Sequence, residues 1–280
     1  MANVFKEDFA KWAIEKSGFW GGDIGSRDRR SIWICGIEEG GDYGDNTLSE
    51  ESLKKRIKKD LNILSCGGTL GLGYKNNYYS VYMNSRDFDK GVLKLINAFI
   101  GYNIKDYKSD NWEDYKKKLP LKPFVENYQK RFFKMNLFPV ASSNENQWNE
   151  HVQNITGFNS KEDFRKWCRG SLDSKNRFAE IRNWVECYRP KLIICFGRNY
   201  VKDFKKAFLT DIKESVEPIL ICGRKLEIYK DNSIDLVVAI CPFPTWRGKN
   251  ALNPNNDDLI QHFGDKIKSE FDRLSSNADA

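Results

Sequence analysis

Residues 189–198 read RPKLIICFGR, and the predicted fold class follows from this stretch. Pro190 ends a helical segment because proline does not continue a helix. The residues after it are apolar without alternation, which is typical of a strand buried on both faces of a parallel sheet. The run ends at Gly197, and glycine permits a tight turn at the end of a strand. The stretch therefore predicts a central strand of an α/β protein.

Three further apolar runs, at 31–35, 132–140 and 235–241, predict strands of the same kind. Helical stretches separate them, and this alternation favours a mostly parallel sheet with helices on both faces. We therefore expect an α/β three-layer sandwich with a central, mostly parallel four-stranded sheet. A hairpin is predicted at 219–229 and a further strand at 79–83. The spacing of apolar residues predicts helices at 5–16, 47–64, 87–100, 160–169, 176–188, 199–208 and 257–274.

The length of the chain fits one large domain. Its 280 residues are enough to bury a sizeable hydrophobic core. We expect a single domain over residues 1–280. Within it, residues from about 45 to 130 are rich in Gly, Tyr, Lys and Asp, and this composition predicts a partly helical insertion.

The charge balance favours a polyanionic partner. There are 46 Lys and Arg against 39 Asp and Glu, which gives a formal net charge of +7. This excess fits nucleic acid as a partner, and it equally fits an ordinary enzyme with extra lysines. The mean hydropathy is −0.64 and the apolar runs are short, which predicts no membrane span. The N-terminus lacks the apolar segment of a signal peptide, so we expect a cytoplasmic protein.

The cysteine and histidine content predicts no metal centre. The chain has 7 cysteines but no C-x-x-C pair, and only 2 histidines, His151 and His262. Zinc and iron–sulfur centres need clusters of such ligands. We therefore expect no cofactor, no metal and no iron–sulfur cluster, and reduced cysteines that are mostly buried.

The candidate site lies where the predicted strands end. Ligands of open α/β sheets bind beyond the carboxyl ends of the strands. This rule singles out segments 36–44, 136–146, 197–199 and 241–249.

The first two of these segments carry polar groups beside apolar runs. Segment 36–44 begins Gly-Ile-Glu-Glu-Gly, which is either a solvated turn or a glycine turn that brings two carboxylates to a ligand. Asn136 sits in an apolar strand, where its amide must be hydrogen-bonded. It is either a structural amide or a group that reads the edge of a planar ring, because it both donates and accepts.

The fourth segment presents aromatic and basic groups on a stiff loop. Pro242 and Pro244 hold it extended, and Trp246, Arg247 and Lys249 follow. Such a combination suits stacking along nucleic acid, or a packed indole beside surface charges.

The segments match, in order, the motifs of a known family. Residues 36–40, GIEEG, stand where the branches of that family have G-Q-D-P-Y, G-E-A-P-G or G-[IMS]-N-P. Residues 135–140, MNLFPV, are similar to the pattern L-L-N-A-V-L-T, and 189–198 to R-P-K-x-I-V-x-L-G-x. Residues 241–246, CPFPTW, take the place of H-P-S-P-L-S or N-P-S, and Arg-Gly follows as in one branch. The chain thus resembles the uracil-DNA glycosylase superfamily over about 30–250, outside the insertion.

The resemblance implies a DNA glycosylase that rotates a nucleotide out of the stack and breaks its bond to the sugar. The transition state has oxocarbenium character, with negative charge on the departing base. The implied catalytic residues are Glu38, which stabilises the cation and holds water, and Asn136, which binds the base edge. The other implied base contacts are Ile37, Glu39 and Cys241, with an aromatic stack from Phe138 or from one of Tyr43, Tyr74, Tyr78 and Tyr79. The implied DNA contacts are Thr245, Trp246, Arg247 and Lys249, with Ser142, Ser143 and Arg198 as further phosphate contacts.

Departures from the family pattern favour a changed base pocket. Glu38 stands where relatives have Asp, Asn or Ala, and no proline follows it. Cys241 replaces the histidine of the last motif and is a much poorer hydrogen-bond donor. With the tyrosine-rich insertion, these changes favour a divergent member that excises a modified pyrimidine, for example glucosylated hydroxymethylcytosine of phage DNA, as antiviral defence.

Three other functions also fit the sequence. The first is a uracil-DNA glycosylase of base excision repair. The second is a non-catalytic DNA-binding module with the same fold, and the third is a hydrolase of free nucleosides or nucleotides. No lysine stands in an identifiable position for Schiff-base chemistry, so an enzyme is expected to hydrolyse only and to leave an abasic site.

Overall fold

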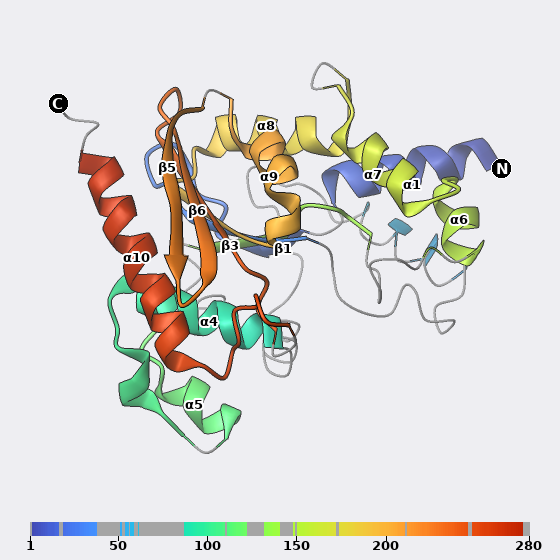
Figure 1. Cartoon of the computed structure of the whole chain (residues 1–280). Helices are drawn as coiled ribbons and strands as arrows, with labels where there is room; N and C mark the ends of the chain where they lie inside the picture. Colours follow the sequence, from blue (N-terminus) through green and yellow to red (C-terminus); the bar gives the residue numbers. More distant parts are fainter. Residues whose placement is uncertain are drawn as a thin grey trace.

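The computed structural model describes most of the chain. The described residues are 2–16, 19–37, 87–109, 111–121, 132–140, 148, 150–171, 174–210, 212–245 and 248–276, with 51, 54, 55, 57, 58 and 61. They form one mixed sheet between two layers of helices, as Figure 1 shows. The α/β class and the three layers agree with the sequence-based expectation. The helix expected at 47–64 lies largely outside the described residues, and the strand expected at 79–83 lies wholly outside them.

The sheet has seven strands in the order β1-β3-β2-β4-β7-β6-β5. Its centre consists of the four strands expected from the apolar runs, and they are parallel to one another. These central strands are β3 (Phe132–Asn136), β2 (Ile32–Gly36), β4 (Leu192–Phe196) and β7 (Leu236–Cys241).

Three antiparallel strands extend the sheet, so the expected number of four was wrong. They are β1 (Phe19–Gly22), β5 (Ile212–Ile221) and β6 (Arg224–Asp231). The predicted hairpin does not stand alone, because β6 pairs with β7 and buries its own side chains. β1 pairs with β3, and its sequence FWGG is too short and too rich in glycine to give a strand pattern.

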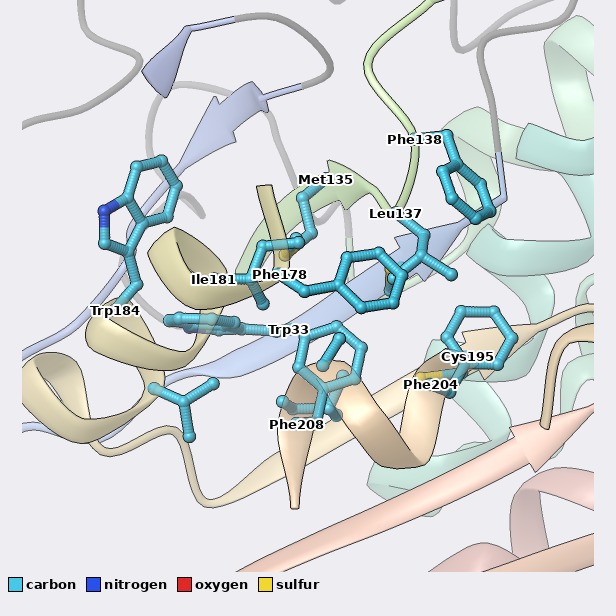
Figure 2. Packing of buried hydrophobic residues seen from close by; sticks show 14 of the residues in the cluster. Trp33, Met135, Leu137, Phe138, Phe178, Ile181, Trp184, Cys195, Phe204 and Phe208 are labelled. Atoms are coloured by element: carbon cyan, nitrogen blue, oxygen red, sulfur yellow. The ribbon is translucent and has the colours of Figure 1, made fainter. Parts of the chain in front are cut away.

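The helices form two layers, one on each face of the sheet. One layer contains α1 (Ala2–Glu15), α7 (Lys161–Arg169), α8 (Arg177–Tyr188) and α9 (Val201–Phe208), with α6 (Glu150–Thr156) beside α1 (Figure 1). Figure 2 shows the core of this layer, where residues such as Trp33 and Met135 of the sheet meet Phe178 and Phe204 of the helices.

The opposite layer contains α4 (Asp87–Ile100), α5 (Trp112–Lys118) and α10 (Asp257–Ser276), and a 3-10 turn (Ile104–Tyr107) joins α4 to α5. α4 and α10 approach closely, because a β-carbon on Gly264 would collide with Ala98. α4 and α5 belong to the predicted insertion, so the described part of that insertion is partly helical, as expected. α4 lies in the core, since Val92, Leu95 and Ile96 are fully buried.

The strand register fixes which side chains face which layer. Gly36 pairs with Asn136, and Phe196 pairs with Cys241, so these four residues end their strands at one level. Side chains alternate along a strand, and Phe196 and Cys241 belong to the core on the α4 side. Asn136 shares that side, because Phe132, four residues before it on β3, is in the same core.

No helix within the described ranges is both long and apolar enough for a membrane crossing.

Candidate functional site

The first and second candidate segments leave the sheet side by side. Their backbone pairing continues past the strands, since the amide of Leu137 donates to the Gly36 carbonyl at 2.9 Å. The amide of Phe138 likewise donates to the Ile37 carbonyl at 2.8 Å. A β-carbon on Gly36 would lie 2.7 Å from Oδ1 of Asn136, so glycine is needed for the amide to lie where it does. The segments that carry Glu38 and Asn136 in the sequence therefore meet at one junction.

The third and fourth segments join the same junction. The amide of Gly197 donates to the carbonyl of Cys241 at 3.0 Å. Gly197 has a φ of 131°, and a β-carbon there would collide with the side chain of Ile37. Gly197 thus contacts the first and the fourth segment at once. The described residues of the four segments thus lie together at the ends of their strands, where the strand pattern predicted them.

A buried arginine holds the exit of β3. Arg177, the first residue of α8, donates to the carbonyls of Asn136 at 2.9 Å and Leu137 at 3.4 Å. It also donates to the carbonyls of Ala13 at 3.3 Å and Ile14 at 3.0 Å, in the last turn of α1. Burial lowers the pKa of Arg177 to about 9. The residue thereby ties the Asn136 backbone to the carbonyl end of α1, where a positive charge is favourable.

The sequence gives one signal for Arg177 that our reasoning missed. The helix beginning after Asn176 was expected, and its first residue is a cation. Positive charge at a helix N-terminus is unfavourable, so a cation there needs a partner elsewhere in the fold. The partners of Arg177 are the four carbonyl oxygens that its fully buried guanidinium binds.

α4 brings an aromatic ring to the same junction. The Cζ atom of Phe88 would lie 3.5 Å from a β-carbon on Gly36, on the side of the sheet that Asn136 faces. The Phe88 ring centre lies 5.4 Å from that of Phe196 and 5.2 Å from that of Phe243. Phe243 follows β7 and is 37% exposed. Two rings from different parts of the chain therefore lie at the edge beside Asn136.

α4 also carries half of a buried ion pair. Asp89, in its first turn, accepts a hydrogen bond from the Lys134 ammonium at 2.6 Å. Lys134 lies on β3 two residues before Asn136, and its ammonium is 5.3 Å from the centre of the Phe88 ring. Sequence reasoning missed Phe88 and Asp89 because α4 falls in the insertion that the motifs do not cover, and it also missed Lys134, which lies on β3 outside that insertion. The signal was a lysine inside the apolar run FFKMN.

Phe138 is a core residue in this structure. Its ring is fully buried, with ring centres of Phe178 at 5.7 Å and Tyr200 at 6.0 Å. The guanidinium carbons of Arg165 and Arg169 lie 5.3 Å and 5.6 Å from its centre. Neither face of the ring is open to a base, so we no longer place the stacking role on Phe138.

Cys241 ends β7 with its thiol fully buried on the α4 side. Burial raises the pKa of this thiol, so it stays neutral at physiological pH. A neutral thiol is a weak hydrogen-bond donor. Cys241 therefore lies at the strand end where the resemblance expects the last motif, and its thiol is both a weak donor and closed to solvent.

Three of the DNA-contact candidates are described, namely Arg198, Thr245 and Lys249. Arg198 follows Gly197, is partly buried, and its Nε is buried without a hydrogen-bond partner among the described residues. Nearby, burial raises the pKa of Glu227, but hydrogen bonds from Tyr229, at 2.5 Å, and Lys225 outweigh burial and leave that pKa lowered. The positive charge of Arg198 lowers it further. Thr245 is partly buried and Lys249 is exposed.

The site candidates that lie outside the described residues are Glu38, Glu39, Tyr43, Tyr74, Tyr78, Tyr79, Ser142, Ser143, Trp246 and Arg247. For Glu38 the structure fixes its neighbour, since Ile37 contacts both Gly197 and the backbone of Phe138.

The described ranges contain no group of three or more His, Cys, Asp or Glu that is able to hold a metal ion. No protein-family model matches the chain, and no curated protein matches it. The junction brings an amide, two aromatic rings and several cations to the ends of four strands. Such a set is able to hold a planar heterocycle and an anionic backbone.

Proposed function

We propose that this protein is a DNA glycosylase that hydrolyses the N-glycosidic bond of a flipped-out non-standard pyrimidine and leaves an abasic site. The observation that carries the proposal is the junction of the four segments. Oδ1 of Asn136 lies where a β-carbon of Gly36 would be, Ile37 packs against Gly197, and the amide of Gly197 donates a hydrogen bond to the carbonyl of Cys241. These are the positions that the resemblance to the uracil-DNA glycosylase superfamily makes functional.

The reaction follows from the chemistry at this junction. The base leaves the stack, and its edge contacts the Asn136 amide, which both donates and accepts. Glu38, one residue past the Ile37 contact, stabilises the positive charge that develops on the sugar and orients water. Water adds to the sugar carbon, and the base leaves with the bonding electron pair and then takes up a proton.

The proposed base is a modified pyrimidine, such as glucosylated hydroxymethylcytosine in phage DNA. Two observations support a pocket unlike one for uracil. Cys241 offers only a neutral buried thiol, and α4 of the insertion lines the junction with Phe88. On this proposal the protein acts in antiviral defence.

Substitution of Glu38 tests the activity. Wild type and Glu38→Gln are incubated with phage DNA that contains glucosylated hydroxymethylcytosine, with uracil-containing DNA and with unmodified DNA, and abasic sites are counted. We expect product from the modified DNA, and a loss of about a hundredfold or more in rate for Glu38→Gln with DNA binding retained. Glu186→Gln, which removes an exposed carboxylate from α8, is the matched control and keeps the wild-type rate.

The other outcomes separate the alternatives. Product from uracil DNA alone supports a repair enzyme and excludes the modified base. DNA binding without product from any substrate supports a binding module, which the weak donor at Cys241 favours. Release of base from free nucleosides, unchanged in Trp246→Ala, supports the nucleoside hydrolase.

A further inference from the structure

Lys134 is a charged residue in a buried strand at the candidate site. Its side chain is 13% exposed and that of its partner Asp89 is 5% exposed. Side chains alternate along β3, so Lys134 and Asn136 lie on the same face, about 7 Å apart along the strand. The Phe88 ring lies between α4 and this face, 5.3 Å from the Lys134 ammonium.

The hydrogen bonds of Lys134 leave donors for a ligand. An ammonium has three N–H groups. Within the part of the chain that the structure describes, Asp89 is the one hydrogen-bond acceptor of Lys134. Lys94, on the same helix as Asp89, makes an informative contrast. It donates both to Asp257 at 2.7 Å and to the Pro254 carbonyl at 2.8 Å, and so joins α4 to the start of α10.

The Lys134–Asp89 pair joins β3 to α4 and is largely buried. Taking two charges out of water costs free energy that their attraction often fails to offset, so an apolar pair of similar volume serves stability equally well. The family pattern L-L-N has leucine at the position of Lys134, where this chain has K-M-N. A charged pair on the same face as Asn136, two residues from it along β3, is a candidate for function.

The reaction needs a donor that the last motif no longer supplies. When the N-glycosidic bond breaks, both electrons stay with the base, and the negative charge that develops there must be stabilised. Cys241 is a weak donor, whereas Lys134 provides an ammonium two residues from the amide that holds the same base.

We propose that Lys134 is a catalytic residue that stabilises the departing base as an anion, in place of the missing histidine of the last motif. This inference rests on the proposed glycosylase function. Lys134 donates a hydrogen bond to the base and keeps its proton. Water gives hydroxide to the sugar carbon, and the remaining proton goes to solvent and later to the base. Asp89 holds the ammonium on this face of the sheet.

The test is the dependence of the rate on the leaving group. Single-turnover rates are measured on one duplex sequence with a series of 5-substituted pyrimidines whose acidity differs. A protein without the donor must depend more steeply on the acidity of the leaving base, because nothing else stabilises its charge. We expect Lys134→Met to lower the rate by about a hundredfold and to steepen this dependence. Lys134→Arg, which keeps a donor cation, recovers part of both.

Two controls separate catalysis from folding. Lys94→Met removes a lysine from the other buried Lys–Asp pair of α4 and is expected to keep the wild-type dependence. The double variant Lys134→Met with Asp89→Leu replaces the whole pair by apolar groups, so we expect it to fold and yet to remain slow. A Lys134→Met protein with the wild-type dependence overturns the assignment of Lys134 while leaving the glycosylase proposal intact. A wild-type protein that releases no base from the series overturns the glycosylase proposal, and the role of Lys134 with it.

Discussion

The Oδ1 atom of Asn136 occupies the space that a β-carbon on Gly36 would need, since the two would lie 2.7 Å apart. Real β-carbons almost never approach another atom so closely. The glycine at the end of β2 therefore sets the position of the amide at the end of β3. Residues that are 100 positions apart in the sequence define a single geometric unit.

Substitution of Gly36 by alanine is expected to separate folding from activity. The added methyl group meets the end of a side chain, which is able to rotate, so the fold is retained. The rotated amide no longer fits the base, and a displacement of about 1 Å costs on the order of a hundredfold in rate. Thermal unfolding and abasic-site formation measure the two effects. Unchanged activity of Gly36→Ala contradicts the role given to Asn136.

Removal of the Arg177 guanidinium is expected to destabilise the protein severely. Arg177→Met leaves four carbonyls at the ends of α1 and β3 without their donor, and buried acceptors without partners are costly. We expect a loss of at least about 3 kcal/mol in urea unfolding. Arg177→Lys recovers little, because one ammonium does not span four acceptors. Lys166→Met, at an exposed position of α7, is the control and stays within about 0.5 kcal/mol of wild type.

The buried thiols are expected to make the protein unstable at alkaline pH. Burial raises the pKa of Cys195 and of Cys241 above the ordinary value of 9.0. The unfolded chain therefore releases these protons first. The stabilisation is complete below pH 9 and is lost as the pH rises above it, by about 1.4 kcal/mol per pH unit for each thiol. Urea unfolding from pH 7 to 10.5 measures this slope. Cys241→Ala reduces it, whereas the same change at exposed Cys187 leaves it unaltered.

Arg198 is expected to contact a phosphate. Its side chain is partly exposed, and it lies one residue beyond the junction glycine Gly197. Each phosphate contact contributes about one to the slope of log affinity against log salt. Arg198→Gln should therefore lower that slope by about one on duplex DNA, whereas Lys268→Gln, at an exposed position of α10 where Lys268 pairs with Asp272, should not. Equal slopes for the two variants would show that Arg198 does not contact a DNA phosphate.

The central sheet was predictable because its strands are buried on both faces. When a proline precedes an apolar run such as LIICF and a glycine follows it, few secondary structures other than a buried strand fit the run. The runs before Gly36 and around Phe132 and Leu236 gave the other parallel strands, and the helix at 87–100 was placed with its observed bounds. α6 was missed because its residues follow a long polar loop and lack an apolar stripe.

The candidate site was predictable where it belongs to the strand ends. Glycine and asparagine at the ends of parallel strands meet at one edge, and the pattern predicts that much. Phe88, Lys134 and Asp89 come together through packing of α4 on the sheet, which no local pattern encodes. Phe138 was misjudged for the same reason, since its apolar ring suits both a core and a stack. In the structure the Phe138 ring lies in the core.

The contact between Arg177 and the last turn of α1 has a practical consequence for anyone who shortens the chain. Ala13 and Ile14 supply two of the four oxygens around that guanidinium. A protein shortened beyond residue 15 would lose these two acceptors, and the Arg177 guanidinium would face the space that α1 occupies, next to the backbone of Asn136. Helix α1 is thus part of the support of the Asn136 backbone, and its loss should weaken that strand end together with the core that Phe9 and Trp12 help to fill.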